Sequence, residues 1–244
     1  MTSSTFNEIH LAEFLRRSPP HAVGRMAEAW DGGKHPGSWF AAVGYASPFF
    51  AVLSPDVKLI RDVVENAIRD ERMSDADVSM LIFAWGGMTV KNAESIVGSI
   101  NHWLKIVSGL RSEQLMYLEA YDRFLAQSLQ GHMPGCGPAY YTKLIFFLTT
   151  HLDRRGFIMD QWLGRSINLL ADREVVLFYQ PRRTVPLKQR YVHKKNACST
   201  YEEFCEAIGH LTPVSGETDH RRACEGGELG NAIVLRGKRQ RRVA

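Results

Sequence analysis

Apolar residues recur every three or four positions along most of the chain, which is the spacing of one face of an α-helix. Val57, Ile60, Val64 and Ile68 form one such face. Capping residues and breaks at glycine or proline set the expected ends of these segments. On this basis we predict helices over Phe6–Arg17, Ala22–Trp30, Val57–Arg69, Ser74–Ala84, Val90–Val107, Ser112–Gln130, Pro138–Leu152, Asp160–Leu170 and Thr200–Ile208.

Few segments have any other pattern. Only Val175–Tyr179 resembles a strand, and Asp31–Pro48, rich in Gly and Pro, is predicted to be loop. The chain contains no internal repeat that we can recognise. The sequence therefore predicts an all-α protein, with a helical domain over residues 1–214 and a loosely ordered tail over residues 215–244.

Composition narrows the class of protein. Of 244 residues, 45% are hydrophobic, which is enough to build a sizeable core. No apolar run reaches the roughly 18 residues that a membrane span needs. The first residues lack the basic start and apolar core of a signal peptide. We therefore expect a cytoplasmic protein that does not bind a membrane, and we expect it to be a monomer.

The cysteines and histidines give no metal-binding pattern. Cys136, Cys198, Cys205 and Cys224 form no CxxC pair. The spacing of Cys198 and Cys205 opens the iron–sulfur loop of some DNA-repair enzymes, but Ile208 occupies the next ligand position. The histidines form no HxxxH motif, and there is no GK[ST] loop for a nucleotide. We expect neither a metal nor another cofactor.

Positive charge is unevenly distributed, although the net charge is only +4. The segment from Val175 to Thr200 contains no acidic residue, and neither does the segment from Leu229 to the end. Runs of this kind attract polyanions, although they can also be solvated surface. The cations of the first run are Arg182, Arg183, Lys188, Arg190, Lys194 and Lys195.

A Pro-Gly-x-Gly turn stands before the apolar helix that is predicted to begin at Pro138. Gly135 and Gly137 can adopt unusual backbone angles and leave their amides accessible. Proline fits the first turn of a helix, and free amides at a helix start bind anions. The turn is either ordinary packing between two helices or a clamp for a DNA phosphate.

Asp160 stands at the predicted start of the following helix. Such a residue can simply cap the helix. A carboxylate beside a bound nucleotide can also stabilise the cationic transition state of glycosidic cleavage and orient a water molecule.

Residues 129–170 resemble the core of the helix-hairpin-helix DNA glycosylases, in the bacterial branch related to 8-oxoguanine glycosylases. The shared features are the Pro-Gly-x-Gly hairpin, an apolar helix, a loop and an aspartate that opens the next helix. The resemblance implies two helical subdomains flanking a DNA-binding cleft. It also implies that Gly135 and Gly137 hold the DNA strand and that Asp160 is the catalytic aspartate. Some members of this branch act against phage DNA that carries modified bases.

The sequence departs from that family at the lysine that lets some members also nick the strand. The position that such members fill with lysine holds Ala139, which implies a monofunctional enzyme that uses water. Lys143 lies one turn later on the same helix face, and its amine could reach the vacated position. Three roles are open for Lys143: a nucleophile, a phosphate contact or an ordinary surface side chain.

Aromatic and apolar residues near these motifs are candidates for base recognition. Tyr140, Tyr141 and Trp162 could line a pocket for a flipped base or could belong to the core. Met88, in the turn at Gly86-Gly87, could fill the gap left in the DNA stack, or the turn could simply break a helix.

The resemblance implies that the protein flips a modified base from double-stranded DNA and hydrolyses its N-glycosidic bond. The base could be a hypermodified phage base, as part of antiviral defence. One alternative is repair of 8-oxoguanine DNA damage with strand nicking through Lys143. Another is a helix-hairpin-helix protein that binds DNA without catalysis.

Overall fold

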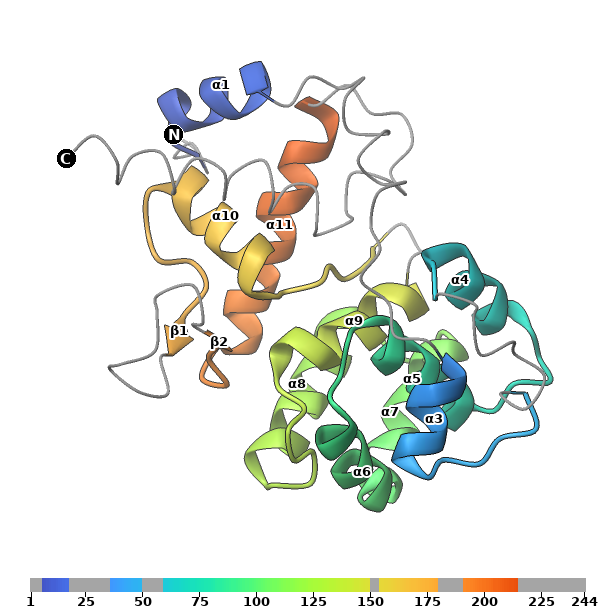
Figure 1. Cartoon of the computed structure of the whole chain (residues 1–244). Helices are drawn as coiled ribbons and strands as arrows, with labels where there is room; N and C mark the ends of the chain where they lie inside the picture. The colour runs from blue at the N-terminus through green and yellow to red at the C-terminus, as the bar shows by residue number, and fades with distance from the viewer. Residues whose placement is uncertain (1–5, 18–35, 50–58, 150–153, 180–190, 215–244) are drawn as a thin grey trace. The chain divides into compact units, whose positions relative to one another are not determined.

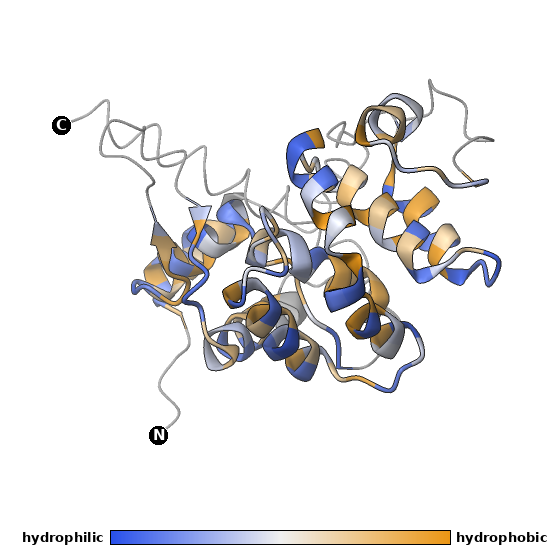
Figure 2. Ribbon diagram, turned by 90° about the horizontal axis from the view of Figure 1, so that it is seen from below, coloured by the Kyte–Doolittle hydropathy of each residue, from blue (hydrophilic) through white to orange (hydrophobic). Residues whose placement is uncertain are grey.

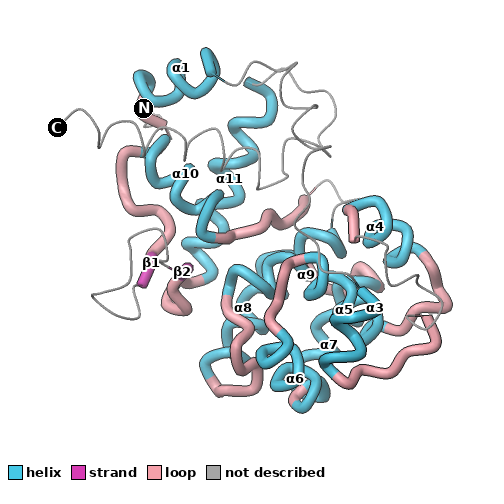
Figure 3. The backbone as a smooth tube through the Cα atoms, in the orientation of Figure 1, coloured by secondary structure: helices cyan, strands magenta, loops and turns pink. Residues whose placement is uncertain are grey.

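The computed structural model describes residues 6–17, 36–49, 59–149, 154–179 and 191–214 (Figure 1). Helices and loops make up almost all of these ranges (Figure 3). The elements in chain order are α1 (Glu8–Arg17), α3 (Pro36–Val43), α4 (Arg61–Arg69), α5 (Asp75–Trp85), α6 (Val90–Gly98), α7 (Ile100–Arg111), α8 (Tyr117–Leu129), α9 (Pro138–Thr149), α10 (Gln161–Ala171), β1 (Phe178–Tyr179), β2 (Tyr191–Val192) and α11 (Cys198–Val214). The fold is all-α, as the sequence predicts. Among the described helices, none is long and apolar enough to cross a membrane.

The chain forms two compact units. The central unit is Asp31–Gly156, and the terminal unit combines Met1–Trp30 with Phe157–Ala244. The terminal unit is therefore assembled from the two ends of the chain. The expected boundary after residue 214 stays a prediction, because residues 215–244 lie outside the described part of the chain.

The central unit is built around two helices that are buried on nearly all sides. Val78–Ala84 of α5 and Tyr141–Thr149 of α9 are buried throughout. Most other helices carry both hydrophilic and hydrophobic residues (Figure 2). A helix that is apolar around its whole circumference requires neighbours on every side, and α4, α5, α7 and α8 all pack against α9. Thr142 and Thr149 of α9 fit this core because each hydroxyl donates to the carbonyl one turn earlier.

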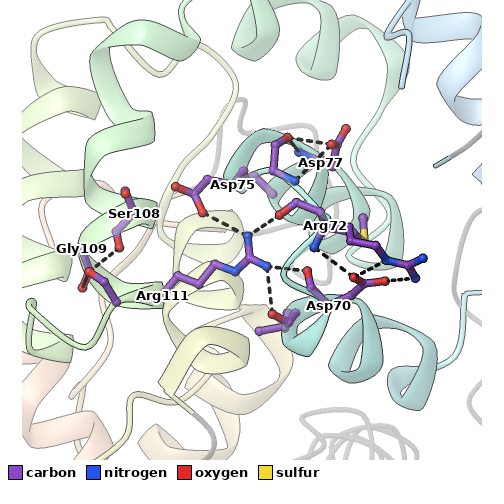
Figure 4. A network of polar contacts seen from close by, with 12 residues as sticks. Asp70, Arg72, Asp75, Asp77, Ser108, Gly109 and Arg111 are labelled. Carbon is purple, nitrogen blue, oxygen red and sulfur yellow. Dashed lines mark hydrogen bonds and ion pairs between the residues drawn. The ribbon is translucent and has the colours of Figure 1, made fainter. Parts of the chain in front are cut away.

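Arg111 of α7 joins α7 to the loop between α4 and α5 (Figure 4). Its Nη2 donates to the carbonyls of Ile68 and Asp70, at 3.1 Å and 2.8 Å. Its Nη1 donates to the carbonyl of Met73 and to the Asp75 carboxylate. The guanidinium thus satisfies carbonyls at the end of α4 that have no partner within the helix.

The terminal unit packs α1 and α11 against α10. The backbone amide of Asn7 donates to the Leu170 carbonyl at 2.8 Å, and the His10 ring lies 2.7 Å from the Leu169 carbonyl. The buried hydroxyl of Tyr201 on α11 donates to the carbonyl of Phe157. β1 and β2 pair in antiparallel fashion, with Phe178 opposite Val192 and Tyr179 opposite Tyr191.

Several predicted helices have the expected ends. Ser74 and Asp77 form a reciprocal capping box at the start of α5, and Asp160 caps α10. The start of α9 at Pro138 is also confirmed. The strand-like segment contains β1, but its pairing with β2 was not predicted.

Other predicted boundaries were wrong. Asp31–Pro48 is not all loop, because α3 lies within it and buries Trp39, Phe40 and Val43 at helical spacing. The long helix expected over Val90–Val107 is two helices, which separate at Ser99.

Two expected helix starts also differ. Ser112 ends α7 instead of starting the next helix, and Glu113 then adopts a positive φ of 58° before α8 begins at Tyr117. Helix α4 begins at Arg61 and not at Val57, which lies among residues 50–58, outside the part of the chain that the structure describes. The helix predicted over Ala22–Trp30 also lies outside the described residues.

Candidate functional site

The Pro-Gly-x-Gly hairpin connects α8 to α9, and its shape depends on Gly135. This residue has a φ of +72°, a conformation that favours glycine. A Cβ at this position would lie only 2.5 Å from Oδ1 of Asn92, a residue of α6. Asn92 therefore packs directly against the hairpin, and any other residue at position 135 would have to displace it.

Three backbone amides of the hairpin are available to an outside acceptor. The Cys136 amide closes the turn by donating to the Met133 carbonyl, and the Tyr141 amide donates to Gly137. The amides of Gly135, Gly137 and Ala139 find no acceptor among the residues that the structure describes. Pro138 contributes no N–H at all. Together with the positive end of the α9 dipole, these amides form a suitable cradle for an anion such as a phosphate.

The Lys143 side chain runs along α9 toward the hairpin. It is only 8% exposed. Its Nζ donates to the Ala139 carbonyl at 2.5 Å and lies 5.4 Å from the centre of the Tyr140 ring. The amine therefore reaches the level of Ala139, one helical turn before its own Cα. The reactive role of Lys143 stays a prediction.

Gly86 makes room for that lysine. A Cβ added to Gly86 would lie 2.7 Å from Cδ and 3.1 Å from Cε of Lys143. Gly86 is the residue that ends α5, and its φ of −69° is accessible to any residue. Space, and not backbone conformation, is therefore the reason for glycine at this position.

The Cys136 thiol is buried in the hairpin. Burial raises its pKa well above the ordinary value, although the positive charge of Lys143 opposes the rise. The thiol therefore stays protonated at neutral pH, and it is a poor candidate for a nucleophile.

Asp160 has a clear structural role as the N-cap of α10. Its Oδ1 accepts the amides of Trp162 and Leu163, at 2.8 Å and 2.9 Å. In the described ranges no group donates to Oδ2. Capping thus fixes the carboxylate and leaves one oxygen available for chemistry. Its catalytic role stays a prediction.

The structure brings some of the predicted site residues together. Gly135, Gly137, Ala139, Tyr140 and Lys143 surround the start of α9 in the central unit. Asp160 and Trp162 lie at the start of α10 in the terminal unit.

Burial distinguishes among the residues that were predicted to line a base pocket or to fill the gap in the DNA stack. Tyr141 is fully buried and packs on the Tyr121 and Phe124 rings, so its position favours core packing. Met88 is also fully buried, and Trp39 donates to its carbonyl. A side chain that enters DNA must be exposed, so the burial of Met88 argues against its predicted role of filling the gap in the DNA stack. Tyr140 and Trp162 are partly exposed.

Comparison with known proteins gives the family. The model of the family described as "Putative 8-oxoguanine DNA glycosylase OGG-like protein" matches residues 25–224, which is more than half of the chain. The chain belongs to this OGG-like family. It matches no curated protein and no solved structure. Membership of the OGG-like family indicates DNA glycosylase activity and a DNA substrate.

The hairpin, Lys143 and Asp160 of this OGG-like protein all lie inside the matched range, whereas α1 precedes it. The predicted DNA contacts Arg182, Arg183, Lys188 and Arg190 lie outside the described residues, while Lys194 and Lys195 are exposed. Among the residues that the structure describes, no group of three or more His, Cys, Asp or Glu side chains could hold a metal ion.

Sequence reasoning missed two residues of the OGG-like site. The paired glycines at positions 86 and 87 indicate a turn, but nothing local shows that Lys143 fills the space over Gly86. Asn92 has no distinguishing signal in the sequence. Both contacts depend on which helices pack together.

Proposed function

We propose that this OGG-like protein is a DNA glycosylase that flips a modified base out of duplex DNA and hydrolyses its N-glycosidic bond. The observation that carries the proposal is the hairpin of the matched region, where the amides of Gly135, Gly137 and Ala139 have no acceptor among the described residues at the start of a helix. Such a cradle binds a phosphate without reading sequence. An enzyme that holds the DNA backbone in this way can present one extruded nucleotide to its catalytic groups.

Asp160 is the catalytic carboxylate in this proposal. As the bond from C1′ to the base breaks, positive charge develops on the sugar, and a nearby carboxylate stabilises that charge. The departing base takes the bonding electrons. Water then adds at C1′ and its proton goes to the departing base, so that the neutral base and an abasic site remain. The amide bonds to Oδ1 hold the carboxylate in one orientation. The exposed Lys194 and Lys195 are suitable for further contacts with phosphates.

We assign the substrate to the bulky modified bases of phage DNA, in preference to 8-oxoguanine. Two features support this choice. Ala139 replaces the lysine of the strand-nicking enzymes, and the described residues contain no β-sheet beyond the two-residue strands β1 and β2. The eukaryotic oxoguanine enzymes, in contrast, carry a β-sheet domain.

The test is release of free bases from a panel of modified DNAs, including phage genomes and DNA containing 8-oxoguanine, measured by mass spectrometry. Asp160→Asn should lower the rate of release at least about 100-fold, because the charged carboxylate is lost. Asparagine caps helices as well as aspartate does, so the melting temperature should hardly change. Asp160→Ala is the comparison, since it also loses the cap and should cost about 1 kcal/mol of stability.

Base release by Asp160→Asn at the wild-type rate would exclude the catalytic assignment. No release from any DNA would instead favour a protein that uses the hairpin only to bind DNA. Release of 8-oxoguanine alone would replace the phage substrate with DNA repair.

The position of the Lys143 amine favours a second candidate activity, which is strand nicking. In that reaction the neutral amine attacks C1′ and the base leaves. The sugar ring opens to a Schiff base, and β-elimination then breaks the 3′ phosphate bond. The amine lies at the level of Ala139, where the family's strand-nicking members carry lysine. A covalent adduct trapped by borohydride is the signature of this chemistry.

A further inference from the structure

The pair of strands β1 and β2 exposes two tyrosines side by side. Tyr179 and Tyr191 are opposite each other in the strand register, and they are 43% and 52% exposed. Their ring centres are 5.8 Å apart with a tilt of 36°. The His193 ring makes an edge contact with Tyr179 at 5.4 Å. Ring surface therefore remains open to a planar ligand after the side chains have packed on each other.

Positively charged residues stand close in sequence to these two tyrosines. Lys194 and Lys195 follow β2 after His193, and both are exposed. The sequence that joins the two strands contains Arg182, Arg183, Lys188 and Arg190, and it has no acidic residue. Aromatic rings beside cations are the usual means of binding a nucleic-acid strand, since bases stack on the rings and phosphates pair with the charges.

A buried asparagine holds this pair of strands in shape. Leu177 donates its amide to Oδ1 of Asn196 at 2.8 Å. Nδ2 of Asn196 donates to the carbonyls of Leu177 and His193, at 3.0 Å and 2.7 Å. The side chain thus links Leu177, the residue before β1, to His193, the residue after β2. A ligand that binds here need not order the backbone first, which lowers the entropic cost of binding.

The strands are also packed tightly on α10, the helix that Asp160 caps. A Cβ on Gly164 of α10 would lie 2.9 Å from Cζ of Phe178 and 3.0 Å from Cγ1 of Val176. The Arg165 guanidinium lies 5.7 Å from the Phe178 ring. The exposed tyrosines therefore belong to the same packed unit as Asp160, within which their positions are fixed.

We propose that Tyr179 and Tyr191 form a stacking platform for an unpaired base of the DNA substrate. DNA as the partner rests on the proposed function. Single-stranded character is required because the bases of an intact duplex are stacked on each other and are not open to the two rings. Lys194 and Lys195 contact the phosphates of the same strand.

The test compares binding of two DNAs, a fully paired duplex and the same duplex with a short unpaired bubble that contains 2-aminopurine. The wild-type protein should bind the bubble more tightly and change the 2-aminopurine fluorescence as the base stacks. The double variant Tyr179→Ala/Tyr191→Ala should bind the bubble about tenfold more weakly and lose most of the fluorescence change. Its affinity for the paired duplex should change little.

The matched control is Tyr179→Phe/Tyr191→Phe, which keeps both rings and should bind the bubble as the wild type does. The stacking platform would be overturned if the double alanine variant lost as much affinity for the paired duplex as for the bubble. An unchanged affinity of this variant for the bubble would also overturn it.

Binding can be measured in the Asp160→Asn protein, so this test does not depend on catalysis. If that variant still releases bases while the alanine pair loses bubble binding, the catalytic assignment fails and the platform stands. If base release needs Asp160 but the alanine pair binds normally, the platform fails alone.

Discussion

The Lys143 stem crosses the space that a side chain at position 86 would occupy. The gap is too small for even one methyl group, since Cδ would lie 2.7 Å from it. Gly86 thereby fixes the path of the lysine, and the bond to the Ala139 carbonyl fixes its end. A glycine can in this way position the side chain of a candidate nucleophile.

We predict that Gly86→Ala displaces the Lys143 amine. If Lys143 forms a Schiff base, borohydride trapping should fall at least tenfold, because a shift of about 1 Å can cost two orders of magnitude in rate. Lys143→Met should abolish the adduct. The free energy of unfolding should change little, because the methyl group meets the flexible end of the Lys143 side chain, which can move aside.

Gly98→Ala is the control for this prediction, because a Cβ there meets nothing within 4 Å. It should leave both trapping and stability essentially unchanged. Trapping by Gly86→Ala at the wild-type level would show that the path of the lysine does not matter. No adduct from the wild-type protein would favour water as the nucleophile.

Among the secondary-structure elements, α4 and α5 are held by an arginine from α7. Arg111 is half-buried and donates to three carbonyls and one carboxylate (Figure 4). Arg72 in the same loop has a different setting, because its guanidinium is largely exposed and pairs with Asp70. The Arg72 guanidinium lowers the pKa of Asp70 to about 2 through hydrogen bonds. It also lies 5.9 Å from the centre of the Phe49 ring, and among the described residues it bonds to no carbonyl at a helix end, unlike Arg111.

We predict that Arg111→Met lowers the free energy of unfolding by about 1–3 kcal/mol, because it leaves the part-buried carbonyls of Ile68 and Met73 without donors. Equilibrium unfolding in urea measures the change. Arg72→Met is the control, and it should leave the midpoint of unfolding unchanged because an exposed ion pair contributes little. Equal effects of the two substitutions would contradict the role of Arg111.

Local signals explain which elements could be predicted from sequence. The starts of α5 and α10 follow from capping residues, and the start of α9 follows from Pro138, because each signal acts within a few residues. Helix α3 was missed because Gly and Pro outweighed the helical spacing of Trp39, Phe40 and Val43. The separation of α6 and α7 at Ser99 was also missed, since the apolar pattern continues across it.

The candidate site also has some features with a local sequence signal and others without one. The hairpin and the cap at Asp160 are local in sequence, so both could be predicted. The contacts of Gly86 with Lys143, and of Asn92 with Gly135, join residues more than 40 positions apart. Only the packed structure reveals these contacts, because the packing of α5 and α6 near the hairpin and α9 has no local signal.

The whole molecule consists of one continuous unit and one that is assembled from both ends of the chain. The central unit has its own core, with Trp103, Tyr121 and Phe124 fully buried. The terminal unit needs residues near the start of the chain, because Asn7 and His10 bond to the last turn of α10.

We predict that the fragment of residues 31–156 folds alone. It should unfold cooperatively with a free energy of about 5–10 kcal/mol, measured by the fluorescence of Trp39, Trp85 and Trp103 during urea unfolding. The fragment of residues 157–244 lacks α1 and is the comparison, for which we expect weaker or no cooperativity. A central fragment without a cooperative transition would show that its core depends on the other unit.

The tie between α1 and α10 has a consequence during synthesis. The ribosome makes α1 first, but the carbonyls of Leu169 and Leu170 that anchor it are added about 160 residues later. At roughly 5–20 residues per second, the interval is about 8–30 s. During that time the central unit can complete its fold, while the first helix has no docking site. An early exposed segment of this kind is a natural target for chaperones and proteases. Helix α1 can dock only after translation has passed α10.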